Sequence, residues 1–317
     1  MILLPPREFV HSPEAAAARY STAEAEAYTR WLATHHYENF QVVSFLLPKR
    51  LHQDFYNVYA YCRWADDLGD EMGSPAESLR LLAWWREQLD AMYAGEAAHP
   101  VFVALRGTVA RHAIPQAPFA DLIRAFEQDQ TVTRYAAWED LLSYCRYSAN
   151  PVGRLVLYLC GYRDEERQRL SDFTCTALQL ANFWQDVIVD YAKDRIYIPL
   201  EDLTRFGCTE EQIARREFTP GFRELMRFEV DRARTLFQLG LPLVKMVNPH
   251  LAADLDLFSR GGLEILNMIE EHDYNVLRAR PSLSKWRKLR LLASAAMKRL
   301  TLAALPSGAA AAGETRA

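Results

Sequence analysis

The sequence predicts an all-α protein, and three observations carry this prediction. Apolar residues recur at helical spacing along almost the whole chain, whereas the alternation typical of strands is nearly absent. Glycine accounts for 13 of the 317 residues, about 4 %, which is below the usual ~7 % and disfavours folds with many glycine turns. Pro and Gly mark most of the gaps between the periodic runs.

The periodic runs predict the helices in order. An Ala/Glu-rich run covers 14–36, and an aromatic-rich run extends from Pro48, which suits a first helical position, to Met72, with Gly73 as the stop signal. Further helices are expected over 75–94, 100–112, 118–130, 138–160, 165–193, 219–246, 250–277 and 282–303.

The helical runs contain no internal repeat and no linker, which favours one bundle over two domains. We therefore expect a single domain over residues 13–304. A Pro-punctuated flexible N-terminus over 1–12 and a flexible small-residue tail over 305–317 should flank it.

Charge and cysteine content exclude several protein classes. The chain has 37 basic and 41 acidic residues, a net charge of −4, so nucleic acid is not expected as a partner. The 5 cysteines form no CxxC pair, which favours reduced, buried thiols in a cytoplasmic protein. No signal peptide and no membrane-spanning run of ~18 apolar residues is expected. The basic segment 285–299 is compatible with peripheral contact to an anionic membrane surface, and the sequence indicates no oligomeric state.

The first candidate site is an acidic cluster that ends the aromatic-rich helix. Asp66 and Asp70 share one helix face, and Asp67 shares another with Glu71. Like charges at this spacing cost about 0.2–0.5 kcal/mol per pair, which a solvated face tolerates. However, a helix that is apolar on most sides is buried, and carboxylates crowded at its inner end need a cation.

A second acidic pair lies on another largely apolar helix. Asn182, Asp186 and Asp190 recur every four residues and share one face. Each pair alone suits an exposed polar stripe, but two such pairs on two apolar helices favour a metal role. Mg²⁺ is usually held by one or two carboxylates together with substrate phosphates. Magnesium would neutralise a diphosphate leaving group, and an apolar, aromatic interior would shelter the resulting carbocation.

These motifs resemble the squalene/phytoene synthase family over about residues 36–290. Asp66-Asp67-x-x-Asp70 is similar to the family's first aspartate-rich motif, and Asp186-x-x-x-Asp190 is similar to the second. The stretch from Tyr144 to Gly153 is similar to the family's Tyr-Cys…Val-Gly segment, and Arg195 with Tyr197 is similar to its diphosphate-binding arginine segment. The resemblance implies a single all-α isoprenoid-synthase bundle.

The resemblance also implies the roles of the site residues. Mg²⁺ ligands would be Asp66, Asp67, Asp70, Asp186 and Asp190. Tyr144 would act in catalysis with Asp66, Asp70, Asp186 and Asp190. A prenyl diphosphate substrate would contact Phe40, Tyr59, Arg63, Asn182, Arg195 and Tyr197. From the residues alone, Tyr144 also suits a core tyrosine, and Arg63 also suits a salt bridge to Asp67 or Asp70.

Two departures from the family pattern indicate the substrate. The segment His36–Phe40 carries Glu38, and Gln185 precedes the second motif, where many members have basic residues. The combination of the segments His36–Phe40, Ser148–Gly153 and Asn182–Val187 resembles the bacterial hydroxysqualene synthase branch, which implies conversion of presqualene diphosphate to hydroxysqualene without a reductant. Rearrangement holds one diphosphate, whereas condensation holds two and needs more positive charge. Lys49 or Arg50 could replace the missing charge.

Three alternatives stay open. A head-to-head synthase would condense two prenyl diphosphates into squalene, presqualene diphosphate or phytoene. A non-catalytic helical assembly factor would have the same fold, but its acidic motifs would have decayed. A carboxylate-bridged di-iron bundle would need Glu-x-x-His motifs, and none accompanies the two acidic motifs.

Overall fold

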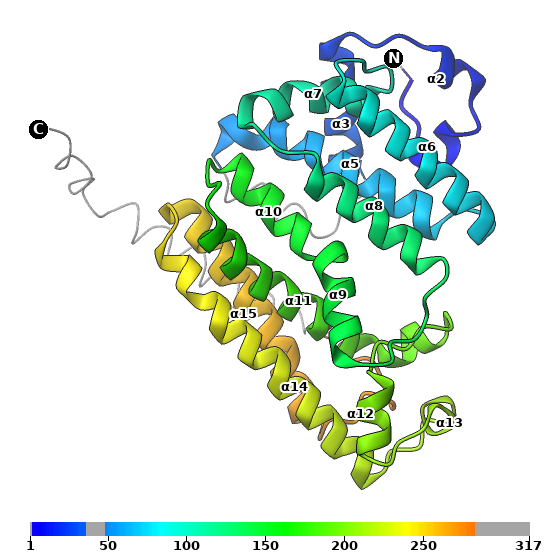
Figure 1. The fold of residues 1–317 in the computed structure, drawn as a ribbon, viewed down its shortest axis with the longest axis vertical. Coiled ribbons are helices and arrows are strands. Elements are labelled where there is room, and N and C mark those ends of the chain that lie inside the picture. Colours follow the sequence, from blue (N-terminus) through cyan, green and yellow to red (C-terminus); the bar gives the residue numbers. More distant parts are fainter. Residues whose placement is uncertain (1, 36–47, 283–317) are drawn as a thin grey trace, which may run out of the picture.

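The computed structural model describes residues 2–35 and 48–282 and confirms the all-α prediction (Figure 1). Within these ranges the regular elements are helices, and the sole bridge pairs Arg134 with Ile196. None of the helices in these ranges is long and apolar enough to cross a membrane. The predicted helix over 282–303, the basic segment 285–299 and the tail 305–317 lie at or beyond the end of the described residues.

The helices fall into two groups along the chain. The first group contains α1 (Pro6–Phe9), α2 (Pro13–Ala17), α3 (Thr22–His35), the 3-10 turn η1 (Lys49–Leu51), α5 (His52–Asp70), α6 (Pro75–Tyr93), α7 (Pro100–His112) and α8 (Ala117–Asp129). The second contains α9 (Trp138–Ser148), α10 (Asn150–Leu159), α11 (Glu165–Tyr191), α12 (Leu200–Arg205), α13 (Glu210–Ala214), α14 (Pro220–Gly240), the 3-10 turn η2 (Leu241–Lys245) and α15 (Pro249–Glu271).

Three predicted helices are interrupted, two of them at proline. The run over 138–160 breaks at Ala149 between α9 and α10, because Pro151 has no N–H and restricts the residue before it. The run over 219–246 continues past Gly240 as the 3-10 turn η2. The run over 14–36 breaks at Ala18, whose backbone is extended.

The N-terminal segment differs from the predicted flexible N-terminus over 1–12. Part of it forms α1, and the Phe9 side chain is only 3 % exposed. The Phe9 ring lies 5.2 Å from Trp64 and 4.8 Å from His99, measured between ring centroids. This segment therefore belongs to the hydrophobic core of the first helix group.

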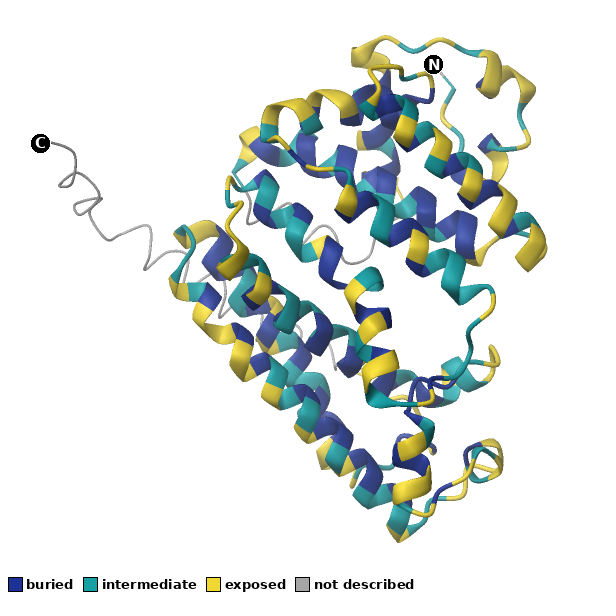
Figure 2. Ribbon diagram, viewed as in Figure 1, coloured by how far each residue is buried: buried dark blue, intermediate teal, exposed yellow. Residues whose placement is uncertain are grey.

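Two large hydrophobic clusters form the core, one in each helix group. Trp64 and Trp85 stack in the first cluster with ring centroids 4.9 Å apart. Trp184, Phe222 and Phe237 are fully buried in the second cluster. Figure 2 shows exposed residues on the outer turns and buried residues where the helices face one another. The helices α5, α10, α11 and α15 meet around one apolar cavity.

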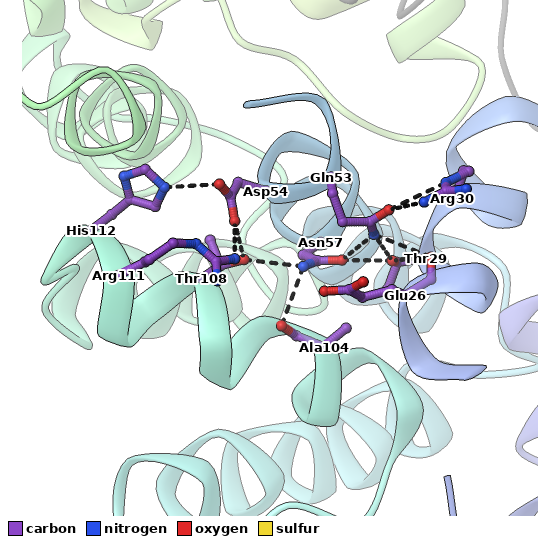
Figure 3. Close-up of polar contacts among 10 residues, drawn as sticks. All are labelled: Glu26, Thr29, Arg30, Gln53, Asp54, Asn57, Ala104, Thr108, Arg111 and His112. Atoms are coloured by element: carbon purple, nitrogen blue, oxygen red, sulfur yellow. Dashed lines mark hydrogen bonds and ion pairs between the residues drawn. The ribbon is translucent and has the colours of Figure 1, made fainter. Parts of the chain in front are cut away.

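A buried polar network anchors the first half of α5 (Figure 3). Asp54 accepts hydrogen bonds from Thr108 and Arg111 of α7 at 2.8 and 2.6 Å, and it lies 2.9 Å from His112 Nε2. Burial opposes ionisation of Asp54, but these three partners outweigh it and lower its pKa. Asn57, one turn further along, bonds to both α3 and α7. The network therefore fixes α5 between two neighbouring helices.

A second polar cluster lies far from α5, between α12 and α14. Arg232 Nη1 donates to Asp202 Oδ2 at 2.5 Å and to Glu229 Oε1 at 3.4 Å. Glu229 is fully buried, and burial is the main cause that raises its pKa to about 8. Asp202 adds to this shift, whereas Arg232 only partly offsets it.

The Glu229→Gln variant is expected to be more stable than the parent protein in alkaline solution. From the ordinary pKa of 4.5 up to about 8, the unfolded chain releases the Glu229 proton while the folded protein keeps it, so stability falls as pH rises. The amide introduced by the substitution does not titrate and can still donate to Asp202. Urea denaturation at pH 5, 7 and 9 should show a difference that grows to about 1–3 kcal/mol. A difference that stays constant with pH would contradict this account.

Candidate active site

The last turns of α5 and α11 carry the two predicted acidic motifs. Their carboxylates belong to Asp66, Asp67 and Asp70 on α5 and to Asp186 and Asp190 on α11. Arg195 lies on the loop after α11, and its Nη2 is 3.4 Å from Asp70 Oδ1. The loop that follows the second motif therefore reaches the first motif.

Arg63 is the counter-ion of the first motif. Its guanidinium lies 3.2 Å from Asp66 Oδ2, 2.5 Å from Asp67 Oδ1 and 3.4 Å from Glu71 Oε1. The sequence left two roles open for Arg63, a contact with diphosphate or a salt bridge to Asp67 or Asp70. The structure contains the salt bridge to Asp67. Arg63 also lies one turn before the motif, so the same guanidinium can face a diphosphate at the end of α5.

Arg280 is the counter-ion of the second motif, and the sequence analysis missed it. Its Nε and Nη2 donate to the two carboxylate oxygens of Asp186, the latter at 3.1 Å. The sequence analysis treated Gln185 as the loss of a positive charge beside the second motif. This interpretation needs correction, because Arg280, distant in sequence, places a cation at Asp186. Lys49 and Arg50 lie in η1, at the opposite end of α5 from the first acidic motif. Glu38, the other residue on which that interpretation rests, lies outside the described residues.

The aspartates fit a site that binds a divalent cation together with a diphosphate. Burial raises the pKa of Asp66, and it raises the pKa of Asp67 and of Asp190 to about 7. The arginines thus do not fully offset burial and mutual repulsion. Within the described ranges, no group of three or more His, Cys, Asp or Glu side chains is arranged to hold a metal ion by itself. Oxygens of a bound diphosphate or of water would complete such a ligand set.

Tyr144 lies beside the acidic motifs and has a partner that sequence reasoning did not find. Its hydroxyl donates to Asp129 Oδ2 at 3.0 Å, from α9 to the end of α8. Burial raises the pKa of Tyr144 well above its ordinary value, and the negative charge of Asp129 adds to this. Burial also raises the pKa of Asp129 to about 7, opposed by Arg195 and the Tyr144 bond. One weak signal existed: a helix C-terminus disfavours an aspartate unless it has a partner.

Aromatic rings stack next to this pair. Tyr197 lies 3.7 Å from Phe183 and 5.9 Å from Tyr144, measured between ring centroids. Tyr135 lies 5.4 Å from Tyr144. The faces of these rings carry partial negative charge and can stabilise a nearby carbocation.

The remaining predicted substrate residues are placed differently. Tyr59 lines an apolar cavity, as described below. Asn182 lies one turn before Asp186 with an exposed side chain. Phe40 lies outside the described residues.

An apolar cavity of about 300 Å³ lies where α5, α10, α11 and α15 meet. On α5 its lining includes Cys62, one turn before Asp66, and on α11 it includes Leu178, two turns before Asp186. Val156 of α10 and Leu255 of α15 belong to its other walls. A hydrocarbon chain can therefore extend from the acidic motifs along α5 and α11 into this space.

The Val156→Phe variant is expected to reduce kcat/KM for prenyl substrates at least roughly tenfold, because the larger ring occupies cavity volume that a hydrocarbon chain needs. Val156 is half-buried, so the added volume is expected to cost little stability. Steady-state kinetics together with thermal unfolding checks this expectation. Unchanged kcat/KM in the folded variant would show that the substrate chain lies elsewhere.

Comparison with known proteins agrees with this geometry. The family model for squalene/phytoene synthase matches residues 33–287. The chain belongs to the squalene/phytoene synthase family. Members of this family are enzymes that use isoprenoid diphosphates, so this protein is such an enzyme.

Individual squalene/phytoene synthase relatives carry several names. A hydroxysqualene synthase from Rhodopseudomonas palustris is 31 % identical over 244 residues, covering 76 % of this chain and 82 % of the relative. A phytoene synthase from Arthrospira platensis is 29 % identical, covering 85 % and 91 %. The crystal structure of squalene synthase HpnC from Alicyclobacillus acidocaldarius is 47 % identical with a TM-score of 0.78, covering 80 % and 96 %. These matches confirm the family that the sequence motifs resemble. They also confirm the all-α isoprenoid-synthase bundle that this resemblance implies.

Proposed function

We propose that the protein converts presqualene diphosphate into hydroxysqualene with release of diphosphate, using Mg²⁺. The observation that carries this proposal is the charge at the second acidic motif, where a neutral, buried Gln185 precedes Asp186 and Arg280 restores one cation. With Gln185, the second motif has a single arginine, Arg280, as its ion-pair partner in the described part of the chain. One diphosphate with its metal suits this charge better than two do.

The relatives support the same choice. The likeness to a hydroxysqualene synthase and the higher identity to squalene synthase HpnC favour triterpene chemistry over phytoene formation. We propose one isoprenoid-synthase domain, as predicted for residues 13–304, and we extend it to include α1 because Phe9 packs in the core. A cytoplasmic location with peripheral contact to the inner membrane surface remains the prediction from sequence.

The proposed reaction begins with loss of the leaving group. The carbon–oxygen bond of presqualene diphosphate breaks, and its electron pair stays on the diphosphate. Bound Mg²⁺, with Asp66, Asp67, Asp70, Asp186 and Asp190 as the proposed ligands, would neutralise the departing charge. Arg63 and Arg195 flank the first motif and orient the diphosphate there.

The carbocation then rearranges and captures water. We place the cation beside the rings of Tyr144, Phe183 and Tyr197, which stack on one another. We place the hydrocarbon chain in the apolar cavity, which keeps other water away from it. Water forms the new carbon–oxygen bond and loses a proton, so no reductant is consumed.

Product analysis in ¹⁸O-labelled water tests the proposal. Purified protein is incubated with Mg²⁺ and either presqualene diphosphate or farnesyl diphosphate, with and without NADPH. We expect labelled hydroxysqualene from presqualene diphosphate, at the same rate with and without NADPH.

Two results would instead favour a head-to-head condensing enzyme. The first is formation of presqualene diphosphate or phytoene from simpler prenyl diphosphates at a rate that matches presqualene diphosphate consumption. The second is squalene that appears only when NADPH is present.

A further inference from the structure

Arg280 donates hydrogen bonds to both carboxylate oxygens of Asp186, which is a proposed metal ligand. The two-pronged contact with Asp186 is the strong geometry for an arginine and a carboxylate. The Arg280 side chain is 48 % exposed, whereas that of Asp186 is 23 % exposed. A metal that binds Asp186 must therefore take at least one oxygen from this guanidinium.

Gln185 holds the backbone next to Arg280. The Gln185 side chain is buried, and its Nε2 donates to the Pro281 carbonyl at 2.5 Å. Its Oε1 accepts from Arg280 Nη2 at 3.4 Å. A buried amide with both ends hydrogen-bonded resists displacement, because an unmade bond there costs the full desolvation of the group. Gln185 thus ties the segment after α15 to the second acidic motif.

We propose that Arg280 is a built-in counter-ion of Asp186 that a divalent metal displaces on binding, and that Gln185 is the positioning residue that keeps Arg280 at the site afterwards. The inference rests on the proposed metal-dependent function. A displaced guanidinium needs a new anionic partner, and a diphosphate provides one. Metal binding alone is therefore opposed by Arg280, whereas binding of metal together with diphosphate is favoured by it.

Mn²⁺ binding followed by electron paramagnetic resonance, with and without inorganic pyrophosphate, tests this proposal. In Arg280→Gln we expect Mn²⁺ alone to bind about two- to tenfold more tightly, the range for loss of one partly exposed opposing charge. The gain in Mn²⁺ affinity on adding pyrophosphate should be smaller than in the parent protein. Gln185→Met, which keeps the volume of the side chain but neither hydrogen bond, should also reduce that gain.

Arg278→Gln is the matched control, because Arg278 is an exposed arginine two residues earlier in the same segment. It should bind Mn²⁺ like the parent protein, with and without pyrophosphate. Arg280→Lys keeps the charge without the two-pronged contact and should lie between parent and Arg280→Gln, which provides a second test if the neutral variant unfolds.

Equal or weaker binding of Mn²⁺ alone to Arg280→Gln and Arg280→Lys would overturn the counter-ion proposal. An undiminished pyrophosphate effect in Gln185→Met would overturn the positioning role. Neither result bears on which prenyl diphosphate is converted, because the labelled-water product analysis decides that separately.

Discussion

Turnover is expected to fall roughly a thousandfold or more when Asp70 or Asp190 is replaced by asparagine, because each loses a proposed Mg²⁺ ligand. The two residues lie on different helices, so equal losses would show that both motifs act on one leaving group. Asparagine has the same shape as aspartate, and both sites hold an excess of negative charge, so folding should survive. Single-turnover kinetics with presqualene diphosphate measures the loss.

Asp194→Asn is the matched control for these variants. Asp194 lies on the loop after α11, four residues beyond Asp190, its side chain is 82 % exposed, and it pairs with Arg134 rather than with the site. Turnover within about twofold of the parent protein is expected. Full activity of Asp70→Asn or Asp190→Asn, or of the parent protein in a chelator, would exclude the metal assignment.

The second large effect concerns the pair formed by Tyr144 and Asp129. Tyr144→Phe and Asp129→Asn are each expected to lower turnover roughly a hundredfold and to change the product mixture. Without its hydrogen bond at 3.0 Å, the Tyr144 ring is no longer held against the Tyr197 stack, where the carbocation is proposed to lie. The double variant should lose little more than either single variant, since both remove one shared interaction.

Tyr147→Phe serves as the control for that pair. Tyr147 lies on the same helix, where its ring packs under Arg124 at 4.1 Å. Its product mixture should match that of the parent protein. Fully additive losses in the Tyr144 and Asp129 double variant would mean that the two residues act independently.

The helices and the acidic motifs could be predicted from sequence because they depend on local spacing. Asp66 and Asp70 share a face by helical geometry alone, and the aromatic residues around them indicate burial. The helix breaks beside Pro151 and Pro242 show the limit of periodicity, which continues across a proline that the backbone does not tolerate.

The partners of the site residues could not be predicted, because they come from distant parts of the chain. Arg280 and Asp186 are 94 residues apart, and Arg195 and Asp70 are 125 apart. Arg280 lies in the irregular segment after α15, where no periodic pattern shows which way a side chain points. Gln185 was interpreted as a lost charge, whereas the structure shows a buried amide that holds the replacement charge.

The cavity where α5, α10, α11 and α15 meet would let the substrate stabilise the fold as well as take part in the chemistry. An apolar space of about 300 Å³ leaves the facing walls of α5, α10, α11 and α15 without full packing partners. A prenyl chain that enters this space would pack against helices of both groups and supply the missing contacts. The apparent stability of the enzyme should therefore rise with the concentration of a non-reacting prenyl diphosphate, so that thermal unfolding reports binding even where no product forms.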